Sequence, residues 1–130
     1  MHKKFILAGA MFGALAVGLG AFGTHGLKKI VTEETVQAFQ TGVQYQMYHA
    51  LALLIAGILY DRVSSKSIQL AGWFFIAGII LFSGSLYLLT ALKATDTIGV
   101  NKIGIITPFG GLSFIAGWVC LLVSFLKKTG

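Results

Sequence analysis

Four long apolar runs, none containing Asp, Glu, Lys or Arg, constrain this chain more than any other feature. They cover residues 5–23, 43–60, 68–92 and 108–126. A bilayer core about 30 Å thick needs roughly 20 helical residues to cross it. Apolar residues do not alternate with polar ones along the runs, which favours helices over barrel strands, and a helix satisfies its own backbone hydrogen bonds in lipid. The sequence therefore predicts an all-α fold, in which residues 1–130 form one integral membrane domain, a four-helix bundle.

Composition supports this class and excludes others. Only 11% of residues are charged and 56% are hydrophobic, whereas a soluble domain carries about 25% charged residues. A nucleic-acid-binding module is also excluded, because no continuous basic face with exposed aromatic residues is present. Cys120 is the only cysteine, so an internal disulfide and a multi-thiolate metal site are both impossible. We predict no cofactor and no metal site.

The basic residues give an expected topology. The first run is longer than the apolar segment of a typical signal peptide, so we take it as the first span. If the N-terminus is cytoplasmic, six of the ten Lys and Arg residues lie on the cytoplasmic side and four on the other. The positive-inside rule then predicts that both termini are cytoplasmic. The cytoplasmic six are Lys3, Lys4, Arg62, Lys66, Lys127 and Lys128, and the other four are Lys28, Lys29, Lys93 and Lys102.

A helix is expected to begin well before the second apolar run. Thr32 followed by Glu33 and Glu34 is typical of an N-cap with acidic residues in the first turn. A helix over residues 33–60 would be about 42 Å long, so its first turns should stand in the head-group region. The connection over residues 93–107 is predicted to be rich in turns and carries no catalytic pattern.

Small residues recur at steps of three and four in the first and last runs. Such stripes let helix backbones approach closely in a membrane. They predict tight packing inside the bundle, or contact with a second copy of the chain. The predicted packing positions are Gly9, Gly13, Gly20, Ser113 and Gly117.

Polar residues gather at one end of each run, over residues 23–26, 44–49, 83–87 and 107–111. Because successive spans alternate in direction, all four groups fall on the same side of the membrane. Polar groups embedded in lipid are costly, so such a cluster is a candidate site. The candidate ligand-binding residues are His25, Gln46, His49, Ser85, Tyr87 and Thr107.

Two interpretations of this cluster remain open. His49 needs a hydrogen-bond partner, which Tyr87, Ser85 or His25 could supply. The first interpretation is a pocket with two imidazoles, suited to proton transfer or to binding a lipid head group. The second is an interhelical hydrogen-bond network that only fixes the bundle. No thiol or acidic neighbour supports metal binding, and no Ser-His-Asp set or phosphate-binding loop is evident.

Four segments of the chain resemble the signature blocks of a known family. They are GAFGTHGL at 20–27, YQMYHALAL at 45–53, FSGSLY at 82–87 and ITPFGG at 106–111. In this order they are similar to the DUF423 family of small bacterial membrane proteins, related to eukaryotic transmembrane protein 256-like proteins. Thr24 departs from the expected Gly-Ala-His-Gly form but leaves His25 in place. The resemblance implies a four-span protein of the bacterial inner membrane and carries over no catalytic residue.

Three hypotheses about function follow. The leading one is a non-enzymatic membrane protein whose one-sided polar pocket binds a lipid head group or a small amphiphile. The second is a membrane enzyme or proton-coupled carrier that uses His25 and His49. The third is an assembly partner that packs through its small-residue faces. The expected partners are membrane lipids and a second copy of the chain, and no nucleic acid.

Overall fold

The computed structural model describes residues 1–63, 66–95 and 100–128, and every element within them is helical. Four segments are long and apolar enough to cross a membrane, which confirms the predicted all-α, four-span fold. The elements are α1 (Lys3–His25), η1 (Leu27–Lys29), α2 (Glu33–Val63), α3 (Lys66–Gly78), η2 (Ile79–Ser83), α4 (Gly84–Ala94), η3 (Val100–Ile105) and α5 (Ile106–Lys128).

Helix α2 begins where the sequence predicts it. The backbone N–H of Thr35 donates to Thr32 Oγ1 at 3.3 Å, and Glu33 and Glu34 occupy the first turn. With 31 residues, α2 is about 46 Å long, which exceeds the thickness of the hydrocarbon core. The helix is uninterrupted over this whole length, as the expected extension before the second apolar run requires.

The third span is one helix with a widened turn in its middle. The α-helices α3 and α4 are joined by η2, a π-helical segment of five residues. A π-helix bonds residue i to residue i+5 and is rare outside single turns. Along the other connection, η3 supplies a 3-10 helix within the stretch predicted to be turn-rich. The predicted turn residues 96–99 lie outside the described residues.

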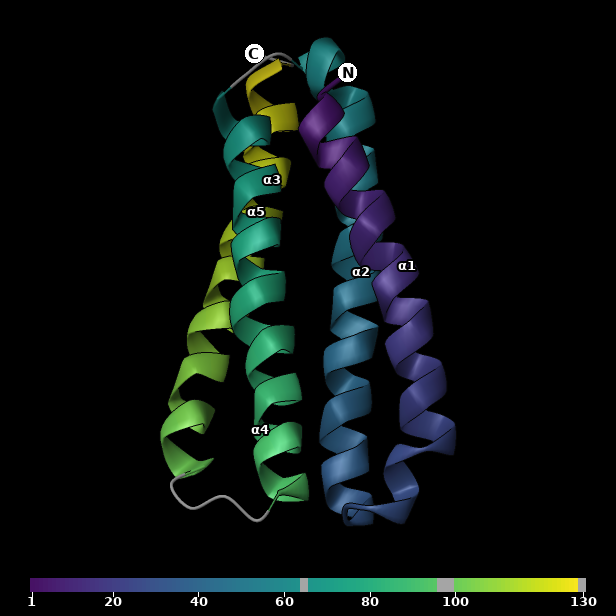
Figure 1. Ribbon diagram of the computed structural model, residues 1–130. Coiled ribbons are helices and arrows are strands. Elements are labelled where there is room, and N and C mark those ends of the chain that lie inside the picture. The colour runs from purple at the N-terminus through teal and green to yellow at the C-terminus, as the bar shows by residue number, and fades with distance from the viewer. Residues whose placement is uncertain (64–65, 96–99, 129–130) are drawn as a thin grey trace.

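The four spans do not close into a ring. Helix α1 packs along α2, and α5 packs along α3 and η2, so that α2 and the third span occupy the centre. Figure 1 shows α1 and α5 on opposite flanks, and both chain termini at the same end. One buried cluster, nearer the termini, includes Phe5, Leu53 and Phe75. A second, nearer the other end, includes Leu27 and Phe39.

The glycines of α1 differ in how closely other residues pack against them. A Cβ atom on Gly9 would lie 2.8 Å from the carbonyl oxygen of Ala50, and one on Gly20 would lie 3.3 Å from Val43. These two glycines therefore allow close packing on α2, as the stripe predicts. The space around Gly13 is open, since a Cβ atom there would have no described atom within 4 Å. Gly13 shares a face of α1 with Gly9 and Gly20, but no described side chain fills the space beside it, so it makes no close contact within the described part of the chain.

The small residues of α5 pack against α3. A Cβ on Gly117 would lie 2.6 Å from Phe75 and 3.2 Å from the carbonyl oxygen of Ala71. The hydroxyl of Ser113 donates to the carbonyl oxygen of Phe74 at 2.8 Å. Both residues therefore sit at the helix–helix contact that their spacing predicts.

Candidate functional site

Gln46 joins three spans through its amide group. The side chain is buried in the middle of α2. Its Nε2 donates to the carbonyl oxygen of Phe12 in α1 at 2.8 Å, and its Oε1 accepts from the hydroxyl of Tyr87 in α4 at 2.6 Å. Donor and acceptor are both used, as a buried amide requires. This arrangement is a structural link between helices.

Serine and threonine hydroxyls fasten the third span to its neighbours. Ser83 donates to the carbonyl oxygen of Gly42 in α2 at 2.6 Å. Ser85 donates to the carbonyl oxygen of Phe82 at 2.8 Å and lies 2.6 Å from the hydroxyl of Thr107 in α5. A serine hydroxyl has one proton, so Thr107 is the donor to Ser85. The clustering of these polar residues, predicted from the sequence, is thus formed as an interhelical network.

His49 lies at the contact between α2 and α5. It is 4% exposed, and its ring stacks on Phe114 with centroids 3.6 Å apart and planes at 10°. Trp118 Nε1 lies 3.0 Å from His49 Nε2, and His49 Nδ1 lies 2.6 Å from the carbonyl oxygen of Tyr45. An indole N–H can only donate, so His49 Nε2 is the acceptor. Nδ1 therefore carries the ring proton and donates a hydrogen bond to the carbonyl oxygen of Tyr45. Both ring nitrogens of a neutral imidazole are therefore occupied.

None of the three residues considered as partners for His49, which are Tyr87, Ser85 and His25, hydrogen-bonds to its ring in the described part of the chain. His25 is exposed at the end of α1, and its side chain makes no hydrogen bond to any residue the structure describes. Because α2 starts at Glu33, His49 lies about 24 Å along the helix axis from its first residue. That places it near the middle of the span, and its partners are Tyr45 and Trp118.

A groove opens between α2, η2 and α5 beside His49. Its volume is about 800 Å³. Along α5 it extends from Pro108 to Trp118, a rise of about 15 Å, which is half of a hydrocarbon core about 30 Å thick. The groove therefore matches one leaflet in depth. Its lining consists of Tyr45, Tyr48, His49, Phe82, Pro108, Gly111, Leu112, Phe114, Ile115 and Trp118.

Two tyrosines, Tyr45 and Tyr48, line the groove. Tyr45 and Tyr48 are 38% and 54% exposed, and neither hydroxyl bonds to another residue in the described part of the chain. A tyrosine hydroxyl in apolar surroundings usually finds a partner. Both tyrosines belong to the polar cluster seen in the sequence, whereas Trp118 stands in an apolar run with nothing to mark it.

Comparison with known proteins places the chain in a family and among relatives named as membrane proteins. The family model described as "Protein of unknown function (DUF423)" matches residues 19–111. The chain belongs to the DUF423 family. All four sequence blocks that carry the resemblance lie within the matched residues, so the resemblance inferred from them is confirmed.

Relatives within this family extend over nearly the whole chain. The UPF0382 membrane protein YwdK of Bacillus subtilis (strain 168) is 46% identical over 126 residues, covering 96% of this chain and 98% of that protein. A UPF0382 membrane protein of Staphylococcus epidermidis (strain ATCC 12228 / FDA PCI 1200) is 41% identical over 128 residues, covering 98% and 99%. No solved structure matches the chain significantly. The DUF423 member described here is therefore a membrane protein with bacterial relatives of the same length.

Proposed function

We propose that this DUF423 member is a non-enzymatic protein of the bacterial cytoplasmic membrane that binds a lipid or similar amphiphile in the groove between α2 and α5. The observation that carries the proposal is the groove itself, which is about 800 Å³ in volume and lined mainly by aromatic and aliphatic side chains. Of the residues expected to bind ligand, His49 lines the groove. Gln46, Ser85, Tyr87 and Thr107 hold in place the helices that form it.

The groove fits the hydrocarbon chain of one membrane lipid. Its depth of about 15 Å corresponds to one leaflet, and its aromatic walls offer apolar contact along that length. The hydroxyls of Tyr45 and Tyr48 supply hydrogen-bond donors for an ester carbonyl or hydroxyl group on the ligand. Sites of this kind combine an apolar lining with few polar groups that set orientation.

Catalysis or proton transfer by His49 is less well supported. Its Nε2 accepts from Trp118 and its Nδ1 donates to Tyr45, so a general base would first have to break one of these bonds. Ser83 and Ser85 are bonded to carbonyl oxygens of the third span and α2, and neither is paired with His49. The geometry favours a structural role for His49 over its use as the base of a catalytic Ser–His pair.

The proposed orientation places both termini in the cytoplasm. The termini lie at the same end of the molecule (Figure 1), as four spans require. Six of the ten Lys and Arg residues fall at that end and four at the other. The excess supports the positive-inside orientation.

Filling the groove should displace the ligand. Gly111 lines the groove, and a Cβ there would have its nearest neighbour, Phe82 Cδ2, at 4.0 Å, so Gly111→Leu can enter the space without a backbone clash. We expect native mass spectrometry of the purified protein to show lipid bound to the wild type and about tenfold less bound to Gly111→Leu, since the new side chain replaces several buried methylene groups of the ligand.

Gly18→Leu is the matched control. Gly18 has no described atom within 4 Å of its Cβ position and lies on α1, away from the groove. This variant should retain the lipid of the wild type. Equal lipid occupancy in the Gly111→Leu protein and the wild type would show that the groove is not the binding site.

A further inference from the structure

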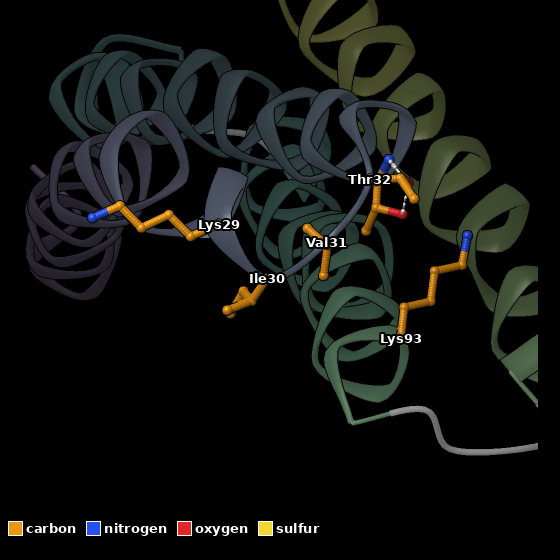
Figure 2. Close-up of a pocket in the computed structure, with 6 residues that line it drawn as sticks. Lys29, Ile30, Val31, Thr32 and Lys93 are labelled. Atoms are coloured by element: carbon orange, nitrogen blue, oxygen red, sulfur yellow. Dashed lines mark hydrogen bonds between the residues drawn. The ribbon is translucent and has the colours of Figure 1, made fainter.

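Charge distinguishes the groove between α2 and α5 from the cavity at the end of the molecule opposite the termini. Figure 2 shows Lys29 and Lys93 at that cavity, whose volume is about 490 Å³. Among the described residues that line the groove, none is Asp, Glu, Lys or Arg. Its histidine, His49, is neutral, because Nε2 accepts a hydrogen bond from Trp118. The groove is therefore suited to an uncharged ligand group.

Six aromatic rings form a continuous wall along the groove. Each ring lies against the next, with centroids between 3.6 and 5.9 Å apart. Phe82 belongs to the π-helical segment η2, and its ring stacks on Tyr45 with planes at 19°. Turns of this kind are frequent at functional sites. All six rings line the groove, and in order along this aromatic wall they are Tyr48, Tyr45, Phe82, Phe114, His49 and Trp118.

The two ends of the aromatic wall leave ring surface uncovered. Tyr48 on α2 is 54% exposed and Trp118 on α5 is 47% exposed, whereas Phe114 between them is 3% exposed. A saturated acyl chain needs only apolar contact, which aliphatic side chains supply equally well. The face of a tyrosine or tryptophan ring is electron-rich, and it also attracts a flat, electron-poor ring that stacks on it. The aromatic wall therefore favours a ligand that carries such a ring.

The tyrosines of the aromatic wall lie near the middle of the span. Tyr45 and Tyr48 precede His49 by four residues and one residue, which is about 6 Å and 1.5 Å along the helix axis. Bringing a charged head group to this depth is costly. An uncharged quinone ring avoids that penalty, and its two carbonyl oxygens can accept hydrogen bonds from tyrosine hydroxyl groups.

We infer that the ligand of this groove is an isoprenoid quinone, with its ring on the aromatic wall and its tail extending into the surrounding lipid. The inference rests on the proposed lipid-binding function and narrows the ligand to one chemical class. Three features favour that class over a charged phospholipid. They are the lack of charge among the described lining residues, the wall of electron-rich rings and the position of the tyrosines near the middle of the span.

The fluorescence of Trp118 tests whether the ring binds in the groove. The chain has two tryptophans, and Trp73 on α3 lines a different, smaller cavity. In the full-length Trp73→Phe protein in detergent, a naphthoquinone with four isoprene units should quench Trp118 to saturation, because quinones quench indole only at short range. In the matched Trp118→Phe protein, quenching of Trp73 should rise linearly through random collisions in the micelle. Identical curves for the two proteins would overturn the inference.

Geranylgeraniol, which has the same tail but no quinone ring, separates this inference from the proposed function. Added in competition, it should restore Trp118 fluorescence with about tenfold weaker affinity than the quinone, the loss expected when a stacked ring contact is absent. Equal affinities for the two compounds would overturn the quinone assignment and leave the groove as a lipid site. Binding of neither compound, while lipid bound to the wild type is lost in Gly111→Leu, would have the same consequence.

Tyr48 is the residue of the aromatic wall to change, because it is the most exposed of the three tyrosine and tryptophan rings there. Tyr48→Leu should weaken quinone binding about tenfold, and Tyr48→Phe, which keeps the ring, should bind nearly as the wild type does. Unchanged geranylgeraniol affinity in Tyr48→Leu shows that the groove is intact. Phe22→Leu is the control, since Phe22 is 49% exposed on α1. Equal quinone binding by Tyr48→Leu and Phe22→Leu would overturn the role of the aromatic wall.

Discussion

Gly110→Ala is expected to lower the free energy of unfolding by about 1–3 kcal/mol, the range for overpacking a close contact. The Cβ of alanine would lie 2.7 Å from the Cα of Phe82, and a backbone atom cannot rotate away as the end of a side chain can. Helix α5 must therefore shift away from η2. Thermal unfolding in detergent, followed by circular dichroism, should show a lower midpoint temperature than in the wild type.

Gly111→Ala is the control for this substitution. The two glycines are adjacent in α5 and gain the same methyl group, but at Gly111 the nearest atom is Phe82 Cδ2 at 4.0 Å. This variant should unfold at or slightly above the wild-type temperature, because alanine favours helix over glycine. Equal midpoints for the two variants would mean that α5 does not approach η2 at Gly110.

His49→Ala should be the most destabilising change in the candidate site. It removes the bonds to Tyr45 and Trp118 and the stacked contact with Phe114. Two hydrogen bonds at about 1 kcal/mol each, together with the space left by the ring, predict a loss of about 2–4 kcal/mol in the free energy of unfolding. Chemical or thermal unfolding of the purified variant in detergent measures it.

Trp118→Phe separates the hydrogen bond from the rest of this contact. It removes the indole N–H but keeps an aromatic ring beside His49, so its cost should be about 1 kcal/mol. If His49→Ala unfolds at the wild-type temperature, His49 is not the link between α2 and α5 described above, and the arrangement of the groove would need revision.

The path of the chain follows from local signals in the sequence. Four uncharged apolar runs are sufficient to predict four spans, and Thr32 with the acidic residues after it is sufficient to predict the start of α2. Gln46 and Tyr87 could be predicted as members of one polar cluster, because alternating spans bring their ends to one side of the membrane. Each of these inferences depends on residue type and spacing along a single helix.

The partners of each residue could not be predicted in the same way. Trp118 stands among apolar residues, where an indole ring is equally suited to face lipid or a neighbouring helix. Gly110 and Gly111 are adjacent residues of the same type, yet only Gly110 closely approaches the backbone of Phe82. The rotation of each helix and the order in which helices pack decide these contacts, and the π-helical turn changes the rotation of the third span without a marker in its sequence. For the same reason the partners of His49 are Tyr45 and Trp118 and not Tyr87, Ser85 or His25, the three residues considered from the sequence.

Photo-crosslinking to lipid tests the central claim most directly. The full-length protein would be placed in nanodiscs that contain a phosphatidylethanolamine with a diazirine group in one acyl chain, and the labelled residues mapped by mass spectrometry. Leu112 and Val17 are 62% and 65% exposed, but only Leu112 lines the groove. A lipid resident in the groove predicts strong labelling of Leu112 and weak labelling of Val17, with the Leu112 label lost in Gly111→Leu. Equal labelling of Leu112 and Val17, unchanged by that substitution, would contradict the account.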